Sequence, residues 1–383
     1  MRGQKHQCSP GASTAKGKTY FTITTPQGEG GIGVVELFGP TARQIISAIF
    51  RPRKSKQDKA LRPNSISLGN ILDHGNKIDE VIVHYLPASK SFSGLDTFEI
   101  NAHGGIMSCR LIGNLLKKKG ARELSYQQTI DLAHKKGQMD SIQKEALEYL
   151  IQAPTQLAAA VLLDQYQGAL SKALKSRRRY KDLIKTAPFG IALTHPQRIL
   201  ILGSPNVGKS TLFNAILGKD RAITHHVAGT TRDTIEENVA INEFPFVLID
   251  TAGLRRITKK DACSCIEKTG MLYAQKEIEK ADLILLVIDQ NTLKDIGALK
   301  ATIMSLTERV EKVIVVQNKI DRAQPKELPL GLPFIPVSAL KRTGMDRLKE
   351  EIIKILGLDD FKYQSGMPVI FTPAQYDKVK KMQ

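Results

Sequence analysis

Short apolar runs separated by polar segments divide the second half of the chain into a regular alternation. After Pro196, five runs of Val, Ile, Leu and Phe predict β-strands, and the segments between them have helical spacing. Near-continuous apolar runs favour a parallel sheet covered on both faces, because a half-exposed strand alternates apolar with polar residues. The predicted strands are Arg198–Gly203, Phe246–Asp250, Leu283–Asp289, Val313–Gln317 and Phe334–Ser338. This pattern predicts a doubly wound α/β domain.

The first 125 residues have a less regular pattern. Short β-branched and aromatic runs near Thr19 and Val34 flank a glycine-rich turn at Pro26–Gly33, and further strands are expected at Ser65–Leu68 and Glu80–Leu86. Two helical stretches lie among these strands. The mixture predicts an α+β domain.

The segment between these regions is expected to be helical. From Tyr126 to Lys185 glycine and proline are sparse while Ala, Leu, Gln and Lys dominate, which predicts two or three helices. The basic stretch Lys175–Lys181 is either the solvated face of a helix or a patch that contacts phosphates. Two prolines and a glycine between Thr186 and Pro196 predict a linker.

The overall charge is strongly positive, since 56 Lys and Arg against 38 Asp and Glu give +18. Such a surplus suits a polyanionic partner such as RNA, and general solubility would also account for it. Four irregularly spaced cysteines are too few for a disulfide framework or a tetrahedral zinc site. Because no apolar run is long enough to cross a membrane and the N-terminus has no apolar signal segment, we expect a cytoplasmic protein.

One glycine-rich segment has the chemistry of a phosphate site. Residues Gly203–Ser210 read GSPNVGKS, follow a predicted strand and open a predicted helix, as a P-loop requires. Gly203 and Gly208 let backbone N–H groups wrap the phosphates, while Lys209 places a cation at the β- and γ-phosphate oxygens. The Ser210 hydroxyl is suited to Mg²⁺, and the amino end of the helix adds a partial positive charge. This segment predicts binding of a nucleoside triphosphate.

Three further motifs follow in order and select guanine. In DTAG (Asp250–Gly253) the carboxylate can hold Mg²⁺ through water, and the Gly253 N–H can meet the γ-phosphate. In NKID (318–321), Asp321 can accept both N1–H and N2–H₂ of guanine, a pair that adenine does not offer. Ser338-Ala-Leu then matches the loop that places a backbone amide near the guanine O6. Together the motifs predict a GTP site.

Thr231, in the GTTRD segment, is expected to complete the Mg²⁺ ligands with Ser210 and Asp250. Leu254 follows DTAG and cannot orient water, so the attacking water needs another polar group. The expected GTP-binding residues are Gly203, Ser204, Pro205, Asn206, Val207, Gly208, Lys209, Ser210, Thr211, Asp250, Thr251, Ala252, Gly253, Asn318, Lys319, Asp321, Ser338, Ala339 and Leu340.

The predicted fold class is multidomain, with an α+β N-terminal domain, an α-helical middle domain and an α/β P-loop GTPase domain built on a doubly wound, mostly parallel sheet. The expected parts are a basic disordered tail (1–17), the N-terminal domain (18–125), a helical domain and linker (126–192), the GTPase domain (193–358) and a C-terminal helical segment (359–383).

Asn206 in the P-loop, GTTRD and DTAGL together resemble the translation and ribosome branch of GTPases, which includes Era, Der and MnmE. Within this branch the N-terminal half resembles MnmE, the tRNA modification GTPase family also called TrmE. The similar stretches are TPQGEGGIGVVELFGP (25–40), FSGLDTFEINAHGG (92–105) and LLDQYQGAL (162–170), and the similarity covers residues 18–375.

The resemblance implies a folate-binding, dimerising N-terminal domain, a GTPase domain inserted in the helical domain, and K⁺-stimulated GTP hydrolysis. Asn206 and backbone carbonyls near His225 and Val227 would ligate K⁺, which replaces an arginine finger. Glu267 aligns with the family's catalytic glutamate, so the expected catalytic residues are Glu267, Lys209 and Thr231. The implied partners are GTP and GDP, tRNA, an MnmG-like flavoprotein and a second copy of the chain.

The sequence departs from the family at two places. Family members end in Cys-x-Gly-Lys, whereas this sequence ends at Gln383 in a stretch that resembles the start of the family's last helical segment. At the folate site, a family arginine is Glu36 here and a family lysine is Gln138, while Glu99 is kept. Folate has an anionic glutamate tail, so a buried and unpaired Glu36 would weaken its binding. We therefore expect weak or no folate binding.

Two functions fit these observations. The family-like N-terminal half favours a GTPase whose cycle serves tRNA wobble-uridine modification. The lack of a C-terminal cysteine favours a GTP-dependent switch, or an RNA or ribosome assembly factor, without modification activity.

Overall fold

A computed structural model describes residues 17–26, 28, 30–53, 61–176, 180–218, 235–250, 276–324 and 331–382. The chain divides into two units, residues 1–144 and 145–383, and each unit contains one β-sheet. The boundaries predicted from the sequence are finer than this division and remain predictions.

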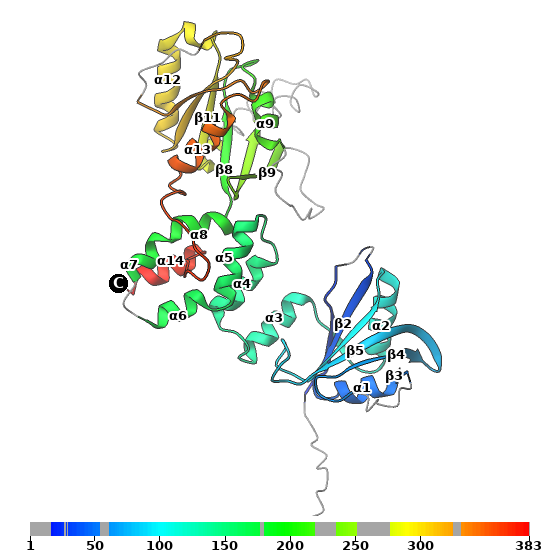
Figure 1. The fold of residues 1–383 in the computed structure, drawn as a ribbon. Helices are drawn as coiled ribbons and strands as arrows, with labels where there is room; N and C mark the ends of the chain where they lie inside the picture. The colour runs from blue at the N-terminus through cyan, green and yellow to red at the C-terminus, as the bar shows by residue number, and fades with distance from the viewer. Residues whose placement is uncertain are drawn as a thin grey trace, which may run out of the picture. The chain divides into compact units, whose positions relative to one another are not determined.

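The first unit is built on a seven-stranded sheet with the order β3-β4-β5-β6-β2-β1-β7 (Figure 1). All neighbouring strands are antiparallel except β1 and β7. Side chains alternate along β2, so Val35 and Leu37 enter the core while Glu36 lies on the other face. The core is completed by α1 and α2, and α3 packs against β1. The bounds are β1 (Tyr20–Ile23), β2 (Ile32–Phe38), α1 (Ala42–Ile49), β3 (Phe50–Pro52), β4 (Ile66–Asp73), β5 (Asn76–Leu86), β6 (Thr97–His103), α2 (Ile106–Lys118), β7 (Arg122–Glu123) and α3 (Tyr126–Lys135).

The region predicted to hold two or three helices contains more, because short breaks interrupt it. Gly137 and Gly168 have positive φ angles, and each separates two helices. The bounds are α4 (Ser141–Leu150), which crosses the boundary between the units, α5 (Gln156–Tyr166), α6 (Ala169–Lys175) and α7 (Tyr180–Lys185). In the part of the chain that the structure describes, no helix is both long and apolar enough to span a bilayer.

The linker predicted between Thr186 and Pro196 is wrong, because this segment forms helix α8 (Ala187–Thr194). Pro188 lies in the first turn, where a helix needs no N–H donor from it. A Cβ on Gly190 would come within 2.1 Å of the Ile370 carbonyl oxygen, so glycine here lets the helix approach the C-terminal segment. At this position the proline and the glycine therefore belong to a helix that packs closely against the C-terminal segment, and they do not form a loop.

The second sheet has the order β13-β12-β11-β8-β10-β9, and all its pairs are parallel except β10 with β9. Five of its strands coincide, within a few residues, with the predicted apolar runs. Strand β9 was not predicted, because it lies at the edge and carries polar residues such as Glu236 and Glu237. The bounds are β8 (Gln197–Leu202), α9 (Lys209–Leu217), β9 (Ile235–Ile241), β10 (Phe244–Asp250), β11 (Leu283–Ile288), η2 (Thr292–Lys294), α12 (Ile296–Thr307), β12 (Val313–Gln317), β13 (Phe334–Pro336), α13 (Met345–Ile355) and α14 (Pro373–Lys380).

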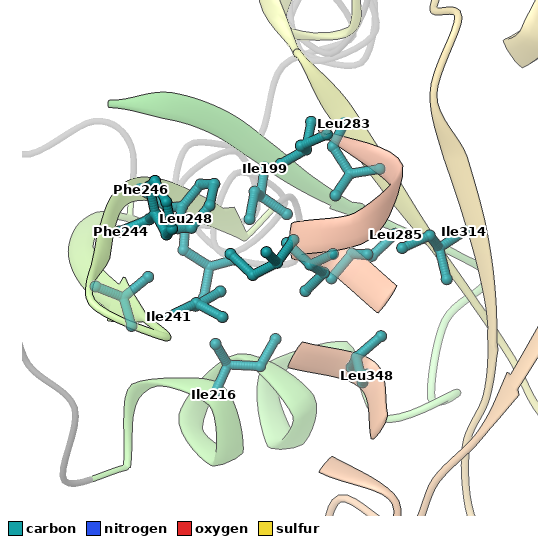
Figure 2. Close-up of a cluster of buried hydrophobic side chains, with 14 of the residues drawn as sticks. Ile199, Ile216, Ile241, Phe244, Phe246, Leu248, Leu283, Leu285, Ile314 and Leu348 are labelled. Atoms are coloured by element: carbon teal, nitrogen blue, oxygen red, sulfur yellow. The ribbon is translucent and has the colours of Figure 1, made fainter. Parts of the chain in front are cut away.

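Both faces of this sheet are buried, which explains the unbroken apolar runs. Ile199 and Ile201 of β8 belong to a cluster that also includes Ile216 of α9 and Leu348 of α13 (Figure 2). Leu200 faces the opposite way, into a second cluster formed with α12. Such double burial fixes the sheet rigidly and leaves its strand ends to position polar groups.

The C-terminal segment returns to the helices through a buried glutamine. Gln165 on α5 is fully buried; its side-chain amide donates to the Met367 carbonyl oxygen at 3.1 Å and accepts from the Val369 N–H at 3.1 Å. Nearby, the Asp164 carboxylate accepts hydrogen bonds from the Tyr363 hydroxyl and the Gly366 N–H. The segment after the second sheet is therefore tied to α5 by side chains that mimic strand partners.

Candidate functional site

The predicted P-loop lies between β8 and α9, at the edge where the carboxyl ends of the parallel strands meet. Both of its glycines are required by geometry. Gly203 has φ 149°, and a Cβ there would meet the Val287 carbonyl oxygen at 2.2 Å. Gly208 has φ 98°, and a Cβ there would meet the Asn318 side-chain nitrogen at 2.3 Å. The loop can therefore curl only without side chains at these two positions.

Lys209 opens α9 and turns its side chain back over the loop. Its ammonium donates to the Gly203 carbonyl oxygen at 3.0 Å and to the Ser204 carbonyl oxygen at 2.8 Å. The residue is only 9% exposed, so the cation is held in the loop rather than extended into solvent. The amino end of α9 lies in the same place, and its N-cap, Gly208, has no side chain that could cap the helix. A cation and the amino end of a helix together favour a polyphosphate.

Asn318 joins the P-loop to the loop after β13. Its amide nitrogen donates to the Val207 carbonyl oxygen at 3.0 Å, and its amide oxygen accepts from the Ala339 N–H at 3.0 Å. The residue is 4% exposed, so these hydrogen bonds are shielded from water. The sequence predicted Asn318 as a nucleotide contact, whereas the structure gives it this bridging position.

Asp321 is positioned by Ser338. The Ser338 hydroxyl donates to the Asp321 carboxylate at 2.6 Å, and this hydrogen bond lowers the pKa of Asp321 below its ordinary value. Ser338 is held in turn by two backbone hydrogen bonds with Thr343, at 3.0 and 3.1 Å. An ionised carboxylate at the surface of this loop can accept two N–H donors from one edge of a guanine base. Leu340 lies beside it and is 70% exposed.

The sequence analysis missed Asp289, which forms an ion pair at the site. Its carboxylate lies 2.8 Å from the Lys319 ammonium, which also donates to the Asn206 carbonyl oxygen at 2.5 Å. Burial raises the pKa of Asp289, but the hydrogen bonds from Lys319 and from the N–H groups of Asn291 and Thr292 outweigh it, so the pKa lies below its ordinary value. The available signal was an acidic residue at the end of an apolar run, at the same sheet edge as Asp250.

Two of the three predicted Mg²⁺ residues are described. Ser210 lies in the first turn of α9, and Asp250 ends β10 with 3% of its surface exposed. A hydroxyl at the start of α9 and a carboxylate at the end of β10 are hard oxygen ligands, which fit Mg²⁺. Other predicted residues lie outside the described part of the chain: Thr231, His225, Val227, Thr251, Ala252, Gly253 and Glu267.

Glu99, the folate residue of the family that this sequence keeps, lies opposite Glu36 in the β2–β6 register of the first unit. Burial and the neighbouring Glu99 raise the pKa of Glu36. Glu99 accepts a hydrogen bond from Asn101 at 3.3 Å and lies 3.8 Å from the His84 ring nitrogen. The register therefore puts two carboxylates side by side on the sheet, an arrangement that disfavours a bound anion at this place.

Two protein-family models match the chain, one in each half. Residues 198–319 match a family described as 50S ribosome-binding GTPase. Residues 19–125 match a family described as GTP-binding protein TrmE N-terminus. The two matches fall on the sheet with the P-loop and on the sheet of the first unit.

Curated relatives extend over nearly the whole chain. The tRNA modification GTPase MnmE of Geobacillus thermodenitrificans is 34% identical, with 87% of this chain and 81% of that protein covered. The MnmE protein of Levilactobacillus brevis is 32% identical, with 95% and 86% covered. That of Alkaliphilus metalliredigens is 31% identical, with 88% and 82% covered. Because these relatives are more than 30% identical over more than four fifths of both chains, the chain is a GTP-hydrolysing enzyme that belongs to the tRNA modification GTPase MnmE family.

Proposed function

We propose that this GTPase couples GTP hydrolysis to a conformational cycle that serves modification of the wobble uridine of tRNA. The Asn318 bridge, which fastens the phosphate loop at Val207 to the base loop at Ala339, supports the GTP-hydrolysis part of the proposal, and the MnmE relatives support the tRNA part. One rigid piece thereby presents phosphate donors and a base-reading carboxylate together. Such preorganisation is what phosphoryl transfer requires of the protein.

Mg²⁺ fits the proposed site, with Ser210, Asp250 and Thr231 as the residues that would hold it. When bound, it would supply positive charge that offsets the negative charge developing on the phosphates during hydrolysis. The chain itself supplies the P-loop N–H groups and Lys209, whose ammonium can exchange the carbonyls of Gly203 and Ser204 for phosphate oxygens. Glu267 is proposed to orient the attacking water, with Thr231 next to the γ-phosphate.

K⁺ is proposed as the activating cation, held by Asn206 and by the backbone carbonyls of His225 and Val227. Asn206 has φ 65°, and its carbonyl is fixed by Lys319, while its side chain is exposed. The side chain is therefore free to ligate a cation although the backbone is locked. A cation in the place of an arginine finger is worth about 10³–10⁵ in rate where a finger is used.

The proposed partners are tRNA, an MnmG-like flavoprotein and a second copy of the chain. Support for a dimer comes from the first unit, where Leu68 and Ile82 are cross-strand neighbours and both are exposed together with Ile66. Folate is proposed to bind weakly, because Glu36 stands where the family has an arginine and lies beside a second carboxylate, Glu99. Low-micromolar binding of 5-formyltetrahydrofolate in a calorimetric titration would overturn that proposal.

The GTPase mechanism is tested by the rate of GTP hydrolysis in KCl and in NaCl at equal ionic strength. The wild type should be faster in K⁺, and Asn206→Ala should lose the difference while still binding GDP. Lys209→Ala should not bind nucleotide. Equal wild-type rates in the two salts would remove the proposed role of Asn206.

The biological role is tested by mass spectrometry of wobble nucleosides from a deletion strain. Loss of the modified uridine, restored by the wild-type gene and not by Lys209→Ala, is the expected result. The alternative, a switch or assembly factor without modification activity, predicts unchanged nucleosides. The relatives favour the first function, since all three are named for tRNA modification.

A further inference from the structure

Three short helices of the second unit carry an unusual density of lysines. The first two are α6 and α7, which are joined by the hydrogen bond from the Tyr180 hydroxyl to the Leu174 carbonyl oxygen at 3.3 Å. The third is α14, which packs against α7 (Figure 1). The exposed lysines, here called the lysine surface, are Lys172, Lys175, Lys181, Lys185, Lys378, Lys380 and Lys381. Arg177–Arg179 lie outside the described residues and are not included.

The charge of this surface is poorly compensated. Within the described residues of the three helices and Lys381, seven lysines stand against two aspartates, Asp182 and Asp377. Among the described residues of these helices only Lys185 forms an ion pair; its ammonium lies 3.6 Å from Asp182, and both side chains are largely exposed. Helix α13 in the same unit is different, because it carries three cations and three anions. The surplus is therefore local to the lysine surface and is not a general property of the unit.

Buried side chains and hydrogen bonds to neighbouring segments hold the helices that carry the lysines in place. Leu183 and Val379 are buried, and the Ile370 N–H donates to the Thr186 hydroxyl at 3.0 Å, which fastens the start of the C-terminal segment to the end of α7. The Gln375 side chain donates to Glu145 at 2.8 Å. A fixed array of cations loses less conformational freedom on binding than lysines on a mobile tail.

We infer that the lysine surface binds the phosphodiester backbone of RNA. A cluster of exposed cations with few acidic neighbours is the electrostatic footprint of a polyanion-binding protein. A membrane surface is the competing partner, but among the described residues of α6, α7 and α14 no large apolar side chain is exposed, and a single exposed methionine, Met382, follows Lys381. Helices that lie on membranes bury such side chains in the interface. The inference rests on the proposed role in tRNA modification and names the surface that would hold the substrate.

The test is the affinity of the full-length protein for an unmodified tRNA transcript, measured by fluorescence anisotropy over a range of KCl concentrations. The variant is Lys175→Gln/Lys181→Gln/Lys378→Gln, one lysine from each helix. The matched control, Lys294→Gln/Lys300→Gln/Arg309→Gln, removes the same charge from exposed positions near α12. A third variant with arginine at the three lysine-surface positions keeps the charge. Basal GTP hydrolysis should be unchanged in all variants, which verifies that they fold.

The lysine-surface variant should bind tRNA at least 10-fold more weakly, and its plot of log affinity against log salt should be shallower by about 2 units, since each lost phosphate contact removes about 0.7–0.9. The control and the arginine variant should bind as the wild type does. Equal binding by the lysine-surface variant, or an equal loss in the control, would reject the assigned surface while leaving the tRNA role intact. A wild type that binds no tRNA would reject both. Loss of binding to phosphatidylserine vesicles with tRNA binding retained would assign the surface to a membrane.

Discussion

At the scale of single residues, the proposed selection of guanine depends on the ionised state and position of Asp321. The Ser338 hydroxyl both orients this carboxylate and keeps its pKa low, so it accepts hydrogen bonds at neutral pH. Sequence reasoning predicted both residues as GTP contacts. It could not predict their hydrogen bond, because they lie on loops after different strands and only the β12–β13 pairing brings them together.

Replacing Asp321 by Asn should change the preferred base from guanine to xanthine. The amide offers one donor and one acceptor, which suits the xanthine edge, whereas guanine loses a bidentate contact worth about 1–3 kcal/mol. GTP affinity should fall on the order of 10- to 100-fold and XTP affinity should rise, as measured by competition with a fluorescent GDP analogue. Asp359→Asn, at an exposed position, is the control. Retained preference for GTP in D321N would contradict the assigned contact.

The Asp289–Lys319 pair should contribute to stability in a pH-dependent way. The pKa of Asp289 is lowered in the folded state. The pair's contribution to stability is therefore present above the unfolded pKa of ~3.9 and is lost as pH falls through the folded value. Lys319→Met should lower the free energy of unfolding at pH 7 by about 1–2 kcal/mol, less than the ~3–5 for a fully buried pair, since the Lys319 side chain is 31% exposed.

Urea denaturation at several pH values checks this, with Lys300→Met as the control. Because the pKa of Asp289 is lowered in the folded wild type, the difference between wild type and variant should be retained from pH 7 down to about 4 and should shrink as pH falls below the unfolded pKa of ~3.9. A difference that is constant with pH would mean that Lys319 contributes through packing or through its hydrogen bond to Asn206 instead.

At the scale of elements, apolar runs predicted the strands whose two faces are both buried. Leu200 and its neighbours Ile199 and Ile201 enter opposite clusters, so each position of that run must be apolar. The apolar pattern did not predict edge strand β9, because an edge strand is open to solvent on one side and can carry glutamates such as Glu236 and Glu237. The pattern also did not predict helix α8, because a proline in its first turn and a closely packed glycine are residues that are also typical of loops.

Close approach of elements around the P-loop makes Gly208 irreplaceable. Gly208→Ala would place a methyl group 2.3 Å from the Asn318 side-chain nitrogen at a φ of 98°. Because both are fixed, we expect the Asn318–Val207 hydrogen bond to break and GDP affinity to fall at least 10-fold by equilibrium fluorescence titration. Gly297→Ala in α12, where a Cβ meets nothing closer than 3.5 Å, should bind GDP normally. Normal affinity in G208A would show that the two loops can separate without loss of the site.

Gln165 should stabilise the attachment of the C-terminal segment to α5. Gln165→Met keeps the volume but leaves the Met367 carbonyl and the Val369 N–H without their partner, which should cost about 2–4 kcal/mol. Thermal and urea denaturation measure this. Gln167→Met, at the exposed C-cap of the same helix, should change stability little. A small effect at both positions would mean that water replaces the Gln165 amide.

At the scale of the whole molecule, each unit has its own core. Every buried member of the first unit's main cluster lies between Phe21 and Ala121, and the two clusters of the second sheet begin at Ala158. Sequence patterns separated these regions because antiparallel alternation gives way to helices and then to parallel apolar runs. They could not fix the boundary, since α4 continues across it without a break in composition.

Separate cores predict that residues 17–144 fold when expressed alone. The fragment keeps its complete sheet and both covering helices, α1 and α2, so it retains the contacts of its main cluster. It should show one cooperative thermal transition by circular dichroism, with dispersed amide signals in its NMR spectrum. A fragment ending at 125 is the informative comparison: it lacks α3, which covers β1, and exposes Phe21's strand on one side, so it should melt at a lower temperature. Equal melting temperatures of the two fragments would mean that α3 does not stabilise the first unit. A fragment 17–144 without a cooperative transition would mean that the first unit depends on the rest of the chain for its stability.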